Sequence, residues 1–349
     1  IVRLTREKKM TDISKNQSKM LKGIAIFFML SLHLFNTTNY TDLYNPLITI
    51  KGLPITYYLS FICDACVPIY CFCAGFAAYL LKNETTQKRF KRVFNLLLTY
   101  WIILTLTCIT GLILNNPNIP CSFATFIGNA LLYHISYVGA WWFMQTYILL
   151  CITSKYLIDL VDKDHNVIML MLSLVIYIIA YYFRMIHPIH TSVNAINYII
   201  NALVLYGTSQ FSYVVGLLFR KHFVMTKLKE RLNNKQVVGI ILMLLSVVLH
   251  IIVKSMIVAP FTGLIFITGF LLIDIKIPFL EEVLLFLGKH STNVWLLHMQ
   301  FYMIFFSKFI FSTHTVLGCI IMLFACCILC SYVVNIIHFK INSIIDYIS

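Results

Sequence analysis

Long apolar stretches alternate along the chain with short polar segments, and ten of these stretches approach the length needed to cross a bilayer. The first, fourth, fifth and eighth stretches are short or interrupted by polar residues, so their ends can shift by several residues. This pattern predicts an all-α, polytopic membrane protein with about ten transmembrane helices. The ten stretches are residues 20–36, 57–81, 93–114, 141–161, 166–184, 196–219, 236–254, 257–274, 291–308 and 315–338.

Composition agrees with this pattern. The 349 residues are 60% hydrophobic and only 11% charged, which leaves too little charged surface for a soluble chain of this length. In a soluble protein the net charge of +14 would suggest a nucleic-acid partner. Here the bias of basic residues toward cytoplasmic segments explains the charge, and we expect no nucleic acid among the partners.

The positions of the basic residues predict the orientation. If the N-terminus is cytoplasmic, the cytoplasmic segments hold 23 of the 27 Lys and Arg residues, since only Lys51, Arg184, Lys254 and Lys308 fall on the opposite side. We therefore expect both termini in the cytoplasm, a multi-pass location in the plasma membrane, and contact of the basic segments with membrane lipids.

The spans leave no room for a soluble domain, because the longest connecting segments have only about twenty-five residues. We expect a basic cytoplasmic tail over residues 1–19, a membrane domain over 20–339 and a second cytoplasmic tail over 340–349. The segment 115–140 carries no Lys, Arg, Asp or Glu and predicts an interfacial helix. The protein must therefore act within the membrane or at its two faces.

Several ionisable residues lie inside predicted spans, where such groups are costly and usually face a cavity or a partner. His33 should lie about 16 Å and His298 about 12 Å from the cytoplasmic face, at a rise of 1.5 Å per residue. Because both helices run in the same direction, the two imidazoles can share one pocket. Asp64 lies near the outer end of the second span. The alternative is a structural histidine bonded to a neighbouring helix, and this is the preferred reading for His250.

Two other motifs carry candidate chemistry. Arg89 and Arg92 are three residues apart at the start of the third span, so both guanidinium groups can converge on one anion. Contact with lipid headgroups is the alternative. Cys63 and Cys66 form a CxxC pair, but no second pair or histidine follows at zinc spacing, so we predict no metal site.

Several segments resemble one known family, the acyltransferase-3 integral membrane acyltransferases. "KMLKGIAIFFMLSLHLF" is similar to its first-helix signature, with Leu21, Gly23 and His33 matching. Arg89 and Arg92 match its RxxR motif. Three further segments match in the same order along the chain: "VPIYCFCAGFAAYL", "AWWFMQTYILL" and "LGKHSTNVWLLHMQFY".

The chain also departs from the family pattern. Many members have Asp-x-Leu-Arg-Gly where the first helix begins, whereas this chain has Lys19 and Lys22 in place of the acid and the arginine. The prolines that are common after the basic turn are replaced by "LLLTYW".

The resemblance implies an O-acetyltransferase. Members move an acyl group, usually acetyl, from cytoplasmic acetyl-CoA or another acyl-CoA to a hydroxyl of an exported polysaccharide or lipid-linked glycan. His33 would act as general base or form an acyl-imidazole, and either route needs a neutral ring. The implied catalytic residues are His33 and His298, the implied donor-binding residues are Arg89, Arg92 and Lys22, and the substrate-binding candidates are Ser291, Asn293, Trp142 and Asp64.

Two other functions compete with acyl transfer. A transporter or flippase of lipid-linked sugars would predict several charges inside the membrane and often an internal repeat. A glycan polymerase would predict a large, basic outer loop. The sequence shows neither pattern.

Overall fold

The computed structural model describes residues 12–273, 275 and 277–348, and this part of the chain is almost entirely helical. Each of the ten predicted spans falls on a helical segment. Eight helical segments of the described chain are long and apolar enough to cross a membrane. They contain α1 (Lys15–Phe35), α2 (Ile55–Leu59) with η2 (Ser60–Ala65) and α3 (Cys66–Leu80), α4 (Thr86–Ile113), η3 (Gly139–Trp141) with α6 (Trp142–Asp162), α7 (Asn166–Tyr181) with η4 (Tyr182–Ile186), α8 (Asn194–His222), α10 (Lys235–Val253) and α14 (Val316–Ile348).

The two remaining predicted spans differ from a straight transmembrane helix. The eighth is short, with η5 (Met256–Val258) leading into α11 (Ala259–Leu272). The ninth starts earlier than expected, because Pro278 begins α12 (Pro278–Met299), a position that suits the fixed φ of proline. After the π-helical η6 (Gln300–Phe305) the chain bends by 102° into a segment formed by α13 (Ser307–Ile310) and η7 (Phe311–Thr313).

Short elements complete the described chain. The segment predicted to hold an interfacial helix contains α5 (Phe123–Ala130). Beyond α1 the chain forms η1 (Thr41–Leu43) and an antiparallel hairpin of β1 (Thr49–Ile50) and β2 (Leu53–Pro54). A short helix, α9 (Val224–Arg231), follows α8.

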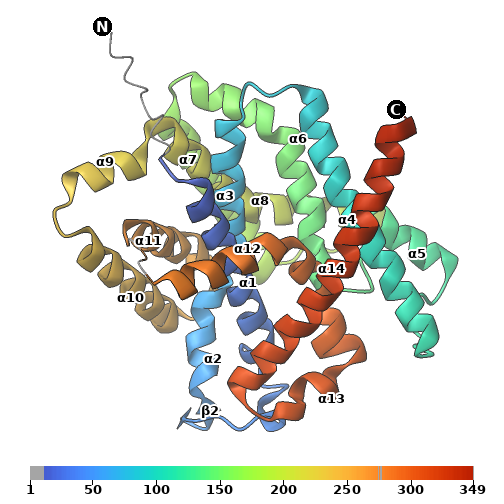
Figure 1. The fold of residues 1–349 in the computed structure, drawn as a ribbon. Coiled ribbons are helices and arrows are strands. Elements are labelled where there is room, and N and C mark those ends of the chain that lie inside the picture. Colours follow the sequence, from blue (N-terminus) through green and yellow to red (C-terminus); the bar gives the residue numbers. More distant parts are fainter. Residues whose placement is uncertain (1–11, 274, 276, 349) are drawn as a thin grey trace, which may run out of the picture.

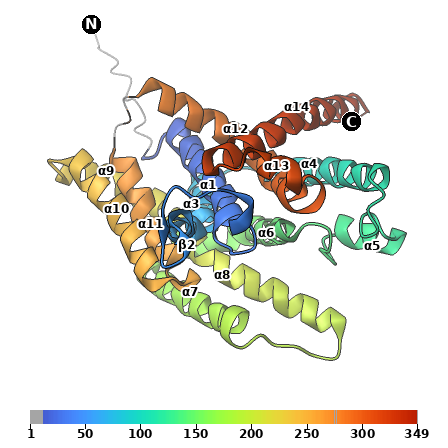
Figure 2. The same cartoon turned by 90° about the horizontal axis from the view of Figure 1, so that it is seen from below.

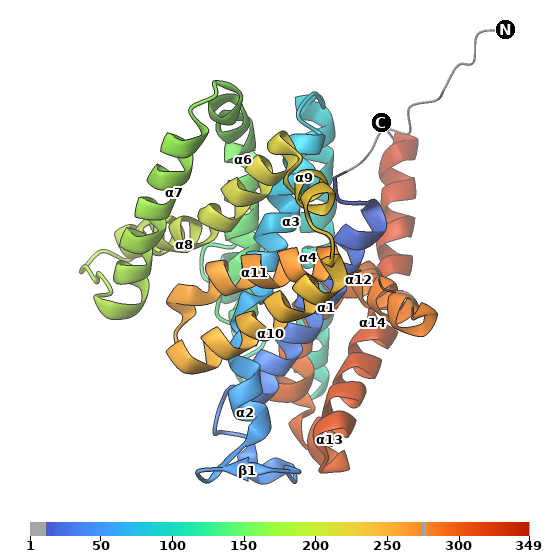
Figure 3. The same cartoon turned by 90° about the vertical axis from the view of Figure 1, so that its left-hand side faces the viewer.

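Figure 1 shows α1 and α3 near the centre of the molecule, with α10 and α11 on one side and α4, α5 and α14 on the other. The view from below in Figure 2 shows the same division. The first turn of α1 and the last turns of α14 lie at one end, while the hairpin and α13 lie at the opposite end (Figure 3). Both chain ends of the described helical bundle therefore point to the same side, as an even number of spans requires.

Side-chain caps fix where two site-bearing helices begin. The Ser14 hydroxyl accepts from the Gln17 amide at 3.1 Å while the Gln17 side chain accepts from the Ser14 amide at 3.0 Å, a reciprocal cap that starts α1. Thr85 caps α4 by accepting from the Lys88 amide. The α4 cap places Arg89 and Arg92 in the first two turns of that helix.

Glycines allow α1 and α12 to pack backbone against backbone. A Cβ atom at Gly23 would overlap the carbonyl oxygen of Leu284, and one at Gly288 would overlap that of Lys19. Small residues permit this approach in helical membrane proteins, where close van der Waals contact replaces the hydrophobic effect as the driving force. His33 and His298 each lie ten residues beyond these glycines, so the close contact sets the spacing between the two imidazoles.

We predict that Gly288→Ala destabilises the protein by about 1–3 kcal/mol, because the new methyl group must push α1 away from α12. Thermal unfolding of the purified protein in detergent would show a lower midpoint. Gly139→Ala is the matched control, since a Cβ there meets only Met299 Cε at 3.7 Å. Equal midpoints for the two variants would contradict the close packing.

Candidate active site

Two cavities lie between helices of the bundle. We call the larger one, of about 480 Å³, the basic cavity, because Lys22, Arg89 and Arg92 line it. We call the smaller one, of about 230 Å³, the histidine cavity, because His33 lines it together with Asp64 and other residues.

The basic cavity collects all three predicted cationic residues. Lys22 comes from α1, whereas Arg89 and Arg92 come from α4, and no Asp or Glu is among the described residues that line the space. Neutral hydrogen-bonding groups on α6 and α12, including Tyr147 and Ser291, complete the wall. The RxxR pair therefore lines one shared space, and this space suits a ligand with several negative charges.

Hydrogen bonds fix the two arginines at one edge of the basic cavity. Arg89 Nη2 donates to the Lys82 carbonyl oxygen at 2.7 Å, and Arg92 forms an ion pair with Glu84. Lys82 Nζ in turn pairs with Asp162 Oδ2 at 2.9 Å, and this hydrogen bond raises the pKa of Lys82. These contacts join the α3–α4 turn to the end of α6 and hold the guanidinium groups beside the cavity.

His33 and His298 meet, as the sequence suggested. Their ring centroids are 5.0 Å apart, and the Tyr302 ring stacks beside both at 6.4 and 6.0 Å. His298 Nδ1 lies 2.7 Å from the Trp295 carbonyl oxygen, which can only accept, so Nδ1 carries the proton of this bond. His298 is fully buried and lines neither cavity. His298 therefore packs against the His33 ring without lining a cavity, whereas His33 lines the histidine cavity.

A second buried pair borders the histidine cavity. Asp64 Oδ2 lies 3.5 Å from His250 Nε2, and His250 Nδ1 lies 2.9 Å from Thr262 Oγ1. The Thr262 hydroxyl donates to the Val258 carbonyl oxygen, so it accepts from His250 Nδ1. His250 thus packs structurally, as interpreted from the sequence, but its partner is the predicted intramembrane acid.

Arg184 belongs to the histidine cavity, and sequence reasoning missed it. Its guanidinium lies 4.8 Å from the Trp142 ring centroid, and Nη1 donates to Thr208 Oγ1 at 3.1 Å. From the sequence, Arg184 counts only as a charge on the outer side. The available signal was its position at the end of the predicted span 166–184, where an ionisable group is a functional candidate. Trp142, a predicted substrate-binding residue, lines the same cavity.

The α12 residues of the segment "LGKHSTNVWLLHMQFY" lie in different surroundings. Some of them line a cavity, and others pack against a neighbouring helix. Ser291 lines the basic cavity, and its hydroxyl donates to the Gly288 carbonyl oxygen. Asn293 lines neither cavity: its amide donates to Ser331 Oγ at 2.8 Å and to Asn335 Oδ1 at 2.9 Å on α14. Its substrate-binding role stays a prediction, and its position favours helix packing. Trp295, which the sequence did not single out, lines both cavities.

The cysteines of the CxxC pair are buried free thiols at the junction of η2 and α3. Among the described residues, no group of three His, Cys, Asp or Glu side chains could hold a metal ion.

A family model described as an acyltransferase domain, that of the acyltransferase-3 family, matches residues 17–332. The chain belongs to the acyltransferase-3 family. Comparisons with curated proteins and with solved structures gave no match. The multi-pass membrane protein is thus an acyltransferase, as the resemblance implied, and the matched region includes both cavities of this acyltransferase.

We predict that His250→Leu lowers the free energy of unfolding of this acyltransferase by about 3 kcal/mol, because Asp64 then lies buried without its partner. Adding Asp64→Asn should restore part of the loss, since the uncompensated carboxylate is gone. Denaturation of both single variants and the double variant in detergent gives the coupling energy. Strictly additive losses would show that the pair does not interact.

Proposed function

We propose that the protein transfers an acetyl group from cytoplasmic acetyl-CoA to a hydroxyl of a polysaccharide or lipid-linked glycan at the cell envelope. One observation carries the proposal: a cavity with three cations lies directly beside a cavity that contains an embedded histidine. A donor with several phosphates suits the first cavity, and a neutral polyol suits the second.

The basic cavity is the proposed donor site. Arg89 and Arg92 lie at the end of the molecule that the charge distribution predicts to be cytoplasmic (Figure 1). Acyl-CoA carries phosphates that cannot cross the bilayer unaided, so its binding site must open on that side. The arginines and Lys22 would hold the phosphates, and the narrow pantetheine arm would extend along α12 past Ser291.

The histidine cavity is the proposed acceptor site. Trp142 offers an aromatic face of the kind that packs on sugar rings, and Asp64 and Arg184 offer hydrogen-bonding groups. Arg184 is already oriented by Thr208 and by the Trp142 ring. The acceptor hydroxyl would lie against His33, the only histidine among the described residues that line this cavity.

The chemistry is a direct exchange of one bond for another. His33 removes the hydroxyl proton as the oxygen attacks the thioester carbonyl carbon, the C–O bond forms, and the C–S bond breaks. The proton then passes from His33 to the departing thiolate, so no net proton is consumed. An acyl-imidazole on His33 is the alternative route, with the same overall balance. The buried ring of His298 limits how the His33 ring can turn.

The first test removes the proposed base. His33→Ala should lower acyl transfer at least about 100-fold, the usual contribution of a general base, while membrane insertion stays normal. Mass spectrometry of ester groups on the surface glycan of expressing cells measures the transfer. His190→Ala, at an exposed histidine outside both cavities, is the control. Normal ester content in the His33 variant would refute the role of this residue.

The second test addresses the donor site. Arg89→Ala with Arg92→Ala should raise the KM for acetyl-CoA by roughly tenfold or more, because charge-assisted hydrogen bonds to the phosphates are lost, with little change in kcat. Steady-state kinetics in membranes measures both constants. Lys88→Ala, an exposed cation on the same turn that does not line the cavity, is the control. An unchanged KM in the double variant would show that the two arginines do not bind the donor and act only in setting the membrane topology.

A further inference from the structure

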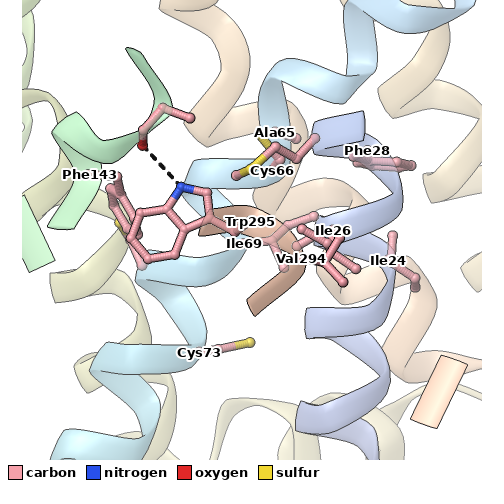
Figure 4. Close-up of a cluster of buried hydrophobic side chains, with 14 of the residues drawn as sticks. Ile24, Ile26, Phe28, Ala65, Cys66, Ile69, Cys73, Phe143, Val294 and Trp295 are labelled. Carbon is pink, nitrogen blue, oxygen red and sulfur yellow. Dashed lines mark hydrogen bonds between the residues drawn. The ribbon is translucent and has the colours of Figure 1, made fainter. Parts of the chain in front are cut away.

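The basic cavity and the histidine cavity have two lining residues in common, Phe143 on α6 and Trp295 on α12. We call this pair the aromatic partition. Figure 4 shows the indole of Trp295 beside the Phe143 ring, with Ile69 and Cys66 of α3 close by. Every other described residue that lines either cavity lines only one of them.

A hydrogen bond and a ring contact orient the partition. Trp295 Nε1 donates to the Ala140 carbonyl oxygen at 3.0 Å, and the indole meets the Phe143 ring edge to face, with centroids 5.5 Å apart. Trp295 is only 7% exposed, and the Gly288 contact fixes the helix that carries it. A turn of the indole about its side-chain torsions would break one hydrogen bond and one ring contact, and it would leave the backbone of α12 in place.

The location of the partition constrains the reaction. Lys22, Arg89 and Arg92 line only the basic cavity, and His33 lines only the histidine cavity. If the donor phosphates lie at the arginines and the acceptor hydroxyl lies at His33, the acyl end of the donor must pass between Trp295 and Phe143. The histidine cavity, at about 230 Å³, must then hold both the acyl group and part of the acceptor.

We propose that Trp295, with Phe143, is a specificity-determining residue that admits a short acyl group to His33 and rejects longer chains. This inference rests on the proposed function and adds the acyl-length limit to it. An indole that fills the passage leaves no apolar space for additional methylene groups. A smaller residue at position 295 would join the two cavities and supply that space.

The test compares chain lengths. Trp295→Ala should raise the ratio of kcat/KM for butanoyl-CoA to that for acetyl-CoA by roughly tenfold or more, because a pocket distinguishes one methylene by about 10–200-fold. Inside-out membrane vesicles from expressing cells would receive radiolabelled acetyl-, butanoyl- or hexanoyl-CoA, and label in the glycan fraction would be counted. Acetyl transfer itself should fall, since a short group no longer fits the enlarged passage.

Trp101→Ala is the matched control. Its indole N–H also donates to a backbone carbonyl oxygen, that of Ala130 at 2.9 Å, but the residue lines neither cavity. The chain-length ratio should not change in this variant. If Trp295→Ala fails to fold, Phe143→Leu enlarges the same passage from α6 and should shift the ratio in the same direction.

The outcomes separate the two proposals. If the wild-type protein transfers acetyl groups and the Trp295 and Phe143 variants keep its chain-length ratio, the partition does not select the acyl group, and this inference is overturned while the proposed function stands. If the wild-type protein transfers no label from acetyl-CoA, the proposed function fails, and the inference fails with it. A higher ratio in the partition variants but not in the Trp101 variant supports both.

Discussion

The close packing of α1 against α12 determines the geometry of the whole site. Gly23 and Gly288 let the two backbones touch, and ten residues further along each helix the imidazoles of His33 and His298 meet. Inside a membrane, such contact rests on van der Waals packing without a hydrophobic driving force between helices, so a single added methyl group matters. The same helix, α12, carries Trp295. The interface between α1 and α12 therefore positions both His33, the proposed base, and the aromatic partition.

Charge is distributed in the membrane domain so that each buried ionisable group has a partner or faces a cavity. Asp64 meets His250, Arg184 lies over Trp142, and Arg92 pairs with Glu84. An unpaired charge inside a membrane domain costs free energy. Charged side chains are therefore found there mainly where they have a partner or line a cavity. The basic cavity suggests a ligand, because its described lining holds three cations and no acid, and the Glu84 carboxylate that pairs with Arg92 lies outside that lining. A polyanionic donor would complete the charge balance there.

Sequence reasoning reached most of the fold because the signals for membrane helices are local. Each of the ten stretches predicted from hydropathy falls on a helical segment of the described chain, and family motifs pointed to His33 with Arg89 and Arg92. It missed the bend after α12 and the break in the second span at η2, since both depend on packing with distant helices. It also missed Arg184 and Trp295, because a charge near a span end and an aromatic residue within a span are common in membrane proteins of every function.

The sequence by itself determined the helical membrane architecture, the residues able to carry a proton or bind an anion, and the family. These follow from composition, periodicity and short motifs, which are properties of neighbouring residues. Only the tertiary structure decided that the RxxR arginines and His33 line separate cavities, that His298 packs against His33 without lining a cavity, and that Trp295 and Phe143 line both spaces. Residues 143 and 295 are far apart along the chain, so no local pattern can reveal that their rings meet.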